Sequence, residues 1–93
     1  MDKEISKDLF EVENPVYQDY DDMKKKYFGY AVVMTNVKSG EYGSILGGVV
    51  RYYTKTSREY INKWGECIHD PQYEECLLYS FIPRTGSLGG LFL

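Results

Sequence analysis

Apolar side chains recur at helical spacing in the first third of the chain. Ile5, Leu9 and Val12 lie at positions i, i+4 and i+7, which is the spacing of one face of an α-helix. We therefore expect residues 1–14 to form an N-terminal arm or a short helix, the helix spanning about residues 3–12.

A second helix is predicted over residues 15–28. Asn14 suits the N-cap, and Pro15 suits the first helical position because its missing N–H would be unpaired there in any case. Acidic residues precede basic residues along this segment, which complements the helix dipole, and Gly29 suits a left-handed stop. The apolar face of this helix would comprise Val16, Tyr20, Met23 and Tyr27.

β-Branched and aromatic residues then indicate a β-hairpin. Residues 30–37 predict its first strand and residues 44–55 its second strand, with a short turn between them. The second segment also fits a helical period, but Gly43, Gly47 and Gly48 each disfavour a helix by about 1 kcal/mol relative to Ala. We expect the last two glycines to mark a bulge or a close backbone approach.

The C-terminal half predicts one more helix and one more strand. Thr56 and Glu59 have the spacing of a capping box, and apolar residues at helical spacing follow them over about residues 56–69. Residues 75–82 predict a buried strand that ends at Pro83.

This order of elements predicts a single α+β domain over residues 15–93. We expect a small antiparallel or mixed sheet of roughly three to four strands, with an N-terminal helix and the helix of about residues 56–69 packed on one face. The predicted strands are apolar on both faces, so helices on one face leave the other to be covered either by the N-terminal helices or by another chain. Exposed apolar faces usually mark interfaces, so the chain is predicted to be a homo-oligomer, most simply a homodimer.

Charge and composition narrow the classes of function. The chain of 93 residues has a formal net charge of −3 and contains ten tyrosines. Duplex nucleic-acid binding requires a basic face, so the acidic balance argues against direct binding of DNA or RNA duplexes. Tyrosine is enriched on surfaces that bind other proteins, so a protein partner is expected.

The sequence also indicates a compartment. It has no run of the about 18 apolar residues that cross a bilayer, and its charged N-terminus differs from a signal peptide. We therefore expect a cytoplasmic protein without membrane association, in which Cys67 and Cys76 are reduced thiols.

Residues suited to catalysis or metal binding are sparse. The only soft ligands for a metal are Cys67, His69 and Cys76. A structural zinc site requires four ligands, so one is missing. A catalytic cysteine needs an oriented base, and the adjacent carboxylates have no sequence neighbours that would separate their pKa values. We predict that the protein is not an enzyme and has no catalytic residue, metal or cofactor.

A glycine-rich segment at residues 84–90 is the best candidate for binding a small ligand. Glycines let backbone N–H groups converge on an anion, and neighbouring hydroxyl and guanidinium groups can complete the cradle. An alternative function is therefore an oligomeric protein that binds or sequesters a nucleotide-like anion. The candidate ligand-binding residues are Arg51, Arg58, Arg84, Thr85 and Ser87.

Acidic and tyrosine side chains are interleaved between residues 11 and 22. Carboxylates can steer a basic partner, and aromatic rings can anchor it. The leading hypothesis is a small non-enzymatic binding protein that inhibits or sequesters a larger protein partner, a role that suits a bacteriophage or mobile-element protein. A purely structural oligomerising module is a third hypothesis. The candidate partner-binding residues are Glu11, Glu13, Tyr17, Asp19, Tyr20, Asp21 and Asp22.

Overall fold

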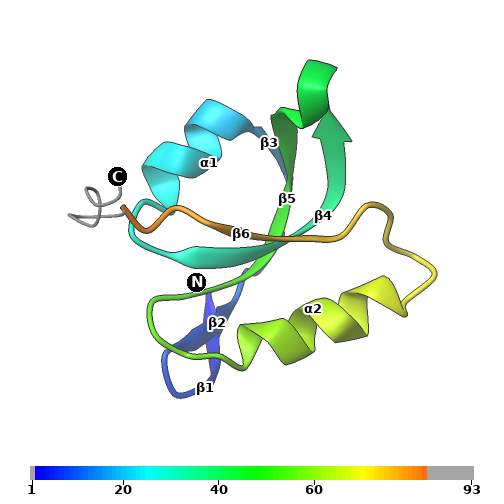
Figure 1. Ribbon diagram of the computed structural model, residues 1–93. Helices are drawn as coiled ribbons and strands as arrows, with labels where there is room; N and C mark the ends of the chain where they lie inside the picture. The colour runs from blue at the N-terminus through cyan, green and yellow to red at the C-terminus, as the bar shows by residue number, and fades with distance from the viewer. Residues whose placement is uncertain (1, 84–93) are drawn as a thin grey trace, which may run out of the picture.

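An antiparallel sheet of six strands forms the centre of the molecule in a computed structural model, which describes residues 2–83 (Figure 1). The α+β class is confirmed, but the expectation of roughly three to four strands is too low. The strand order is β1-β2-β5-β4-β6, and β3 also pairs with β5. The elements are β1 (Lys3–Ser6), β2 (Leu9–Glu11), β3 (Tyr17–Asp19), α1 (Tyr20–Lys26), β4 (Ala31–Ser39), the 3₁₀ turn η1 (Glu41–Gly43), β5 (Ile45–Thr54), α2 (Tyr60–Ile68) and β6 (Leu77–Ser80).

The N-terminal segment is a β-hairpin, so the helix predicted over residues 3–12 is wrong. β1 pairs with β2, and β2 in turn pairs with the end of β5. A register shift between Glu4 and Ser6 interrupts the alternation of β1, and Asp8 turns the chain with a φ of +61°. These two irregularities place apolar residues at intervals that resemble a helical period.

The helix predicted over residues 15–28 is also shorter than expected, because its first part is strand β3. β3 pairs with the glycine-containing part of β5, and α1 starts only at Tyr20. Asn14 is therefore not the helix cap and instead has a φ of +54° in the connection between β2 and β3. The acidic-to-basic order along α1 and the left-handed Gly29 agree with the sequence expectation.

The β4–β5 hairpin and β6 lie where the sequence predicts strands. Gly47 makes the expected close approach, because a Cβ placed there would lie 2.5 Å from the carbonyl oxygen of Gln18 in β3. β6 pairs with β4 and is an edge strand of the sheet (Figure 1).

The helix predicted over about residues 56–69 is confirmed as α2, but its predicted capping box is wrong. α2 starts at Tyr60, and Glu59 rather than Thr56 is its N-cap. The Thr56 hydroxyl donates instead to the Asp8 carboxylate, 2.7 Å away. The Ser57 hydroxyl accepts from the Glu59 amide. A long-range partner from the β1–β2 turn thus replaces the local capping interaction.

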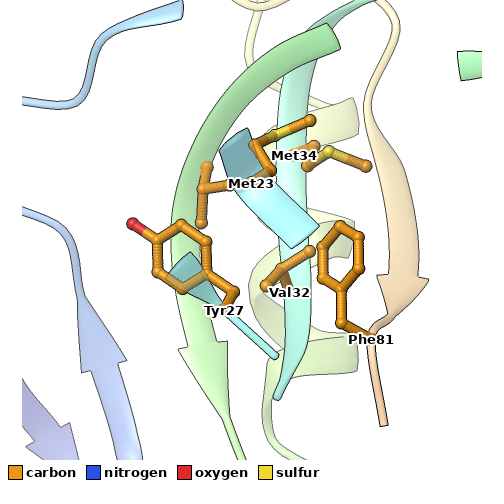
Figure 2. Packing of buried hydrophobic residues seen from close by; sticks show 6 residues of the cluster. Met23, Tyr27, Val32, Met34 and Phe81 are labelled. Carbon is orange, nitrogen blue, oxygen red and sulfur yellow. The ribbon is translucent and has the colours of Figure 1, made fainter. Parts of the chain in front are cut away.

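The two helices cover opposite faces of the sheet, so the prediction that they pack on one face is wrong. Met23 of α1 and Tyr27, the residue that follows α1, pack on Val32 and Met34 of β4 in the main core, which also includes Val50 and Phe81 (Figure 2). We call this the α1 side. On the other face, the α2 side, the Lys63 ammonium of α2 lies 5.8 Å from the centre of the Tyr52 ring. Both faces of the sheet therefore carry a helix within residues 2–83.

Candidate functional site

A groove opens where the start of α1 meets the tip of the β4–β5 hairpin. Its volume is about 420 Å³. α1 contributes Tyr20, β6 contributes Tyr79, and the hairpin contributes the remaining wall. We call this the hairpin-tip groove; its lining residues are Tyr20, Gly43, Ser44, Ile45 and Tyr79.

Two tyrosines form the floor of the hairpin-tip groove and fix each other's positions. The Tyr20 and Tyr79 hydroxyls are hydrogen-bonded at 2.9 Å, and their rings meet edge to face with centroids 5.9 Å apart. Phe81 packs against both rings, with centroid distances of 5.8 and 5.0 Å. The hydrogen bond to Tyr20, followed by burial, raises the pKa of Tyr79. The groove floor is therefore rigid, aromatic and neutral.

Beside the groove, the hairpin tip presents an aromatic side chain to solvent. Tyr42 is fully exposed, at 102 % of its reference area, and has a left-handed backbone with a φ of +58°. A bulky residue rarely adopts this conformation, which costs of order 1–3 kcal/mol. In this turn the Gly40 N–H donates to the Ser44 carbonyl, and the N–H and hydroxyl of Ser44 both donate to the Glu41 carbonyl. The fold thus presents Tyr42 on a hydrogen-bonded turn.

Carboxylates lie next to the groove at the start of α1. Asp19 and Asp21 flank Tyr20 in the chain, and Asp21 and Asp22 occupy the first turn of the helix. All three are exposed, and Asp19 makes no side-chain capping hydrogen bond to the helix. Four of the seven predicted partner-binding residues, Asp19 to Asp22, are therefore gathered at one end of the molecule.

The other three predicted partner-binding residues lie elsewhere. Glu11 in β2 pairs with Tyr52 on the α2 side, and Glu13 lies in the connection between β2 and β3. Tyr17 lies over Gly47 on the α2 side, with the Lys38 ammonium 5.6 Å from its ring centre. Tyr17 and Tyr20 thus belong to opposite faces of the sheet, although they are close in the chain.

Sequence reasoning missed Tyr42, Ile45 and Tyr79 as members of the site. Tyr79 is 59 residues from Tyr20 in the chain, so only the strand order brings them together. Tyr42 directly follows the turn predicted over residues 38–41 and lies between Gly40 and Gly43, and this position was the available signal of an exposed aromatic residue.

The residues proposed for anion binding are separated by α2. The Arg51 guanidinium stacks on Tyr73 at 4.5 Å and donates from Nε to the Thr35 hydroxyl at 2.9 Å, beyond the C-terminal end of the helix. Arg58 precedes the N-terminal end, and nine helical residues span about 13 Å. The structure therefore does not bring these two arginines together. Arg84, Thr85 and Ser87, with the rest of the loop 84–90, lie outside the described residues.

The cysteines lie on the α2 side. Burial, with a smaller contribution from Cys76, raises the pKa of the Cys67 thiol to about 11, and burial raises the pKa of Cys76 as well. Both thiols are thus protonated near neutral pH, which disfavours nucleophilic attack. Within residues 2–83 no group of three or more His, Cys, Asp or Glu residues could hold a metal ion.

No protein-family model matches the chain, and no match was found among curated proteins or solved structures. Neither helix in the described part of the chain has the length and apolarity needed to cross a membrane.

Proposed function

We propose that the chain is a non-enzymatic protein-binding module that engages a basic partner protein through the hairpin-tip groove, Tyr42 and the neighbouring carboxylates. By occupying this surface of its partner, it would inhibit or sequester that partner. The observation that carries the proposal is the complete exposure of Tyr42 in an unfavourable backbone conformation beside an aromatic groove.

The chemistry of the surface defines the partner. A rigid aromatic floor can accept an aliphatic side chain, and Tyr42 can insert into a pocket of the partner, as interface tyrosines commonly do. Asp19, Asp21 and Asp22 add three exposed negative charges beside Tyr20 at the start of α1. Such charges accelerate association with a basic surface and make it salt-dependent.

The test is affinity capture from extracts of the source cells, with purified chain as bait and mass spectrometry of the bound proteins. We expect the wild type to capture a basic protein. Tyr42→Gly should weaken the affinity for that protein about thirtyfold, which is the effect of removing a contact worth about 2 kcal/mol. Combined Asp19→Asn, Asp21→Asn and Asp22→Asn should weaken capture, most clearly at low salt.

The controls separate binding from folding and from net charge. Tyr42→Gly should raise the free energy of unfolding by up to about 1 kcal/mol, because glycine adopts a positive φ without strain. Combined Glu66→Gln, Glu74→Gln and Glu75→Gln changes the net charge equally at exposed sites away from the groove. Capture that is unaffected by the surface variants, or lost equally with the control triple variant, contradicts the proposal.

A further inference from the structure

The outer edge of β6 has no backbone partner among residues 2–83. β6 pairs only with β4, and among residues 2–83 no strand lies on its other side. The Phe81 N–H donates to the Tyr30 carbonyl across the sheet at 2.8 Å. Because backbone groups alternate along an antiparallel strand, those of Leu77 and Tyr79 also face β4, and those of Leu78 and Ser80 point outward. The edge thus offers N–H and C=O groups in a regular repeat.

β6 is short, but it lacks the charged side chains that commonly prevent strand pairing. No charged residue occurs between Cys76 and Ile82. β1, at the opposite end of the sheet order, has exposed Lys3 and Glu4 and an irregular register, and both features discourage the addition of another strand. β3 also pairs on one side only, but it is three residues long and ends at the exposed Asp19. β6 is therefore the uncharged edge at which this sheet is most open to extension within residues 2–83.

We infer that a second copy of this chain covers the β6 edge, by antiparallel pairing of β6 with β6 about a two-fold axis near Leu78. Leu78 is half-buried on the α2 side, and pairing places it opposite its own counterpart. On the α1 side, pairing places Leu77 opposite Tyr79 of the second copy. Apolar side chains thus meet on both faces, and the two six-stranded sheets become continuous.

Self-pairing suits this edge better than pairing with a foreign strand. A two-fold axis at Leu78 satisfies the outward groups of Cys76, Leu78 and Ser80 in each copy at once, because each Cys76 then faces a Ser80. The chain is acidic overall, so two copies repel each other in general, but the uncharged edge brings no like charges into direct opposition. A strand of a few residues makes a small interface, so we expect the dissociation constant of the dimer to lie in the micromolar range.

Concentration-dependent measurements on the full chain test the inference. Sedimentation should give the monomer mass at low micromolar concentration and the dimer mass at hundreds of micromolar. Over the same range, amide exchange at Leu78 and Ser80 should slow by at least about tenfold, and amides of Leu77 and Tyr79 should be protected throughout. A monomer at every concentration, or a dimer with unchanged exchange at Leu78 and Ser80, overturns the inference.

A pair of variants gives a second test. Leu78→Lys places two like charges opposite each other and should abolish the dimer, whereas Ile61→Lys, at an exposed position of α2, should leave it intact. Tyr42→Gly should also leave it intact, so failure of the proposed partner surface and failure of this interface are distinguishable. If Leu78→Lys unfolds the chain, the exchange measurement on the wild type decides.

Discussion

Individual residues with left-handed backbone conformations determine where this chain turns. Asp8, Asn14 and Asn36 have positive φ values, and Asn and Asp adopt this conformation more readily than other residues that carry a side chain. Tyr42 and Glu75 also have positive φ values, and their residue types give no such signal. Sequence reasoning can therefore anticipate the first group of turns more readily than the second.

Two glycines provide opposite outcomes for the same substitution. Gly47→Ala should lower the free energy of unfolding by about 1–3 kcal/mol, because the new methyl group would overlap the Gln18 carbonyl of β3 and the Tyr17 ring. Gly65→Ala, in the interior of α2 with open space around its Cβ position, should raise it by about 0.5–1 kcal/mol. Chemical denaturation measures both, and equal effects of the two substitutions would contradict this packing.

At the scale of elements, the sequence predicts β4, β5, β6 and α2 but not the N-terminal strands. In β4 and β5, long runs of β-branched and aromatic residues match the structure that their neighbours require. The N-terminal strands are three or four residues long; β2 and β3 hydrogen-bond to β5, and β1 hydrogen-bonds to β2. Their spacing of Ile5, Leu9 and Val12 mimics a helix, so local pattern alone favours the wrong structure.

The candidate site was predictable only in the part that is contiguous in the chain. Asp19 to Asp22 follow one another, so a local charge pattern identifies them. Ile45 and Tyr79 join them through strand order, and Tyr17 is moved to the other face by the pairing of β3 with β5. Such placements depend on long-range pairing, which residue spacing does not encode.

One carboxylate joins the N-terminal hairpin to the connection before α2. Asp8 accepts from the Thr54 hydroxyl, the Lys55 amide and both the amide and the hydroxyl of Thr56. These hydrogen bonds, with those from Thr56 foremost, lower the pKa of Asp8 from its ordinary value of 3.8. The ionised form is therefore favoured by folding, so its contribution to stability is present above pH about 4 and is lost as the pH falls below it.

Asp8→Asn should accordingly lower the melting temperature at neutral pH, and the difference from the wild type should shrink on acidification to about pH 2. Asparagine keeps the left-handed turn, so the comparison isolates the charge. Asp22→Asn, at an exposed position of α1, serves as the control and should change the melting temperature much less. A difference that stays constant across the acid range would show that the charge of Asp8 is not the cause.

At the scale of the whole molecule, most tyrosine side chains are partly or fully buried and pack on a small sheet. Only Tyr17 and Tyr42 of the ten tyrosines are exposed. Tyr53 stacks on Phe10 and also contacts Tyr27 and Tyr30, so one ring organises a cluster on the α1 side. Within residues 2–83 both faces of the sheet carry a helix, so an uncovered face no longer supports the expected homo-oligomer. Large apolar side chains remain exposed elsewhere, among them Tyr42 at the hairpin tip, Phe28 after α1 and Ile61 in α2.

Alkaline titration should reveal this use of tyrosine. Burial raises the pKa of Tyr27, Tyr52 and Tyr53 above the ordinary value of 10.0, and the pKa of Tyr52 reaches about 12. The hydrogen bond with Tyr20 raises the pKa of Tyr79. Folding favours the neutral phenols, so their contribution to stability is full below pH about 10 and declines as the pH rises toward 12.

We expect tyrosinate absorbance to lag behind that of the denatured chain and to rise together with the loss of native circular dichroism. The same titration in denaturant is the control, in which all tyrosines should ionise near pH 10. Complete ionisation near that pH with an intact fold would contradict the burial described here.

The central position of β5 has a consequence for synthesis on the ribosome. Residues 9–11 and 17–19 both hydrogen-bond to β5, which spans residues 45–54. β2 and β3 therefore emerge from the ribosome long before β5, and they cannot pair with β5 until it has been synthesised. Once it has emerged, β5 can first pair with β4, the strand that precedes it in the chain. β2 and β3 can pair with β5 after that.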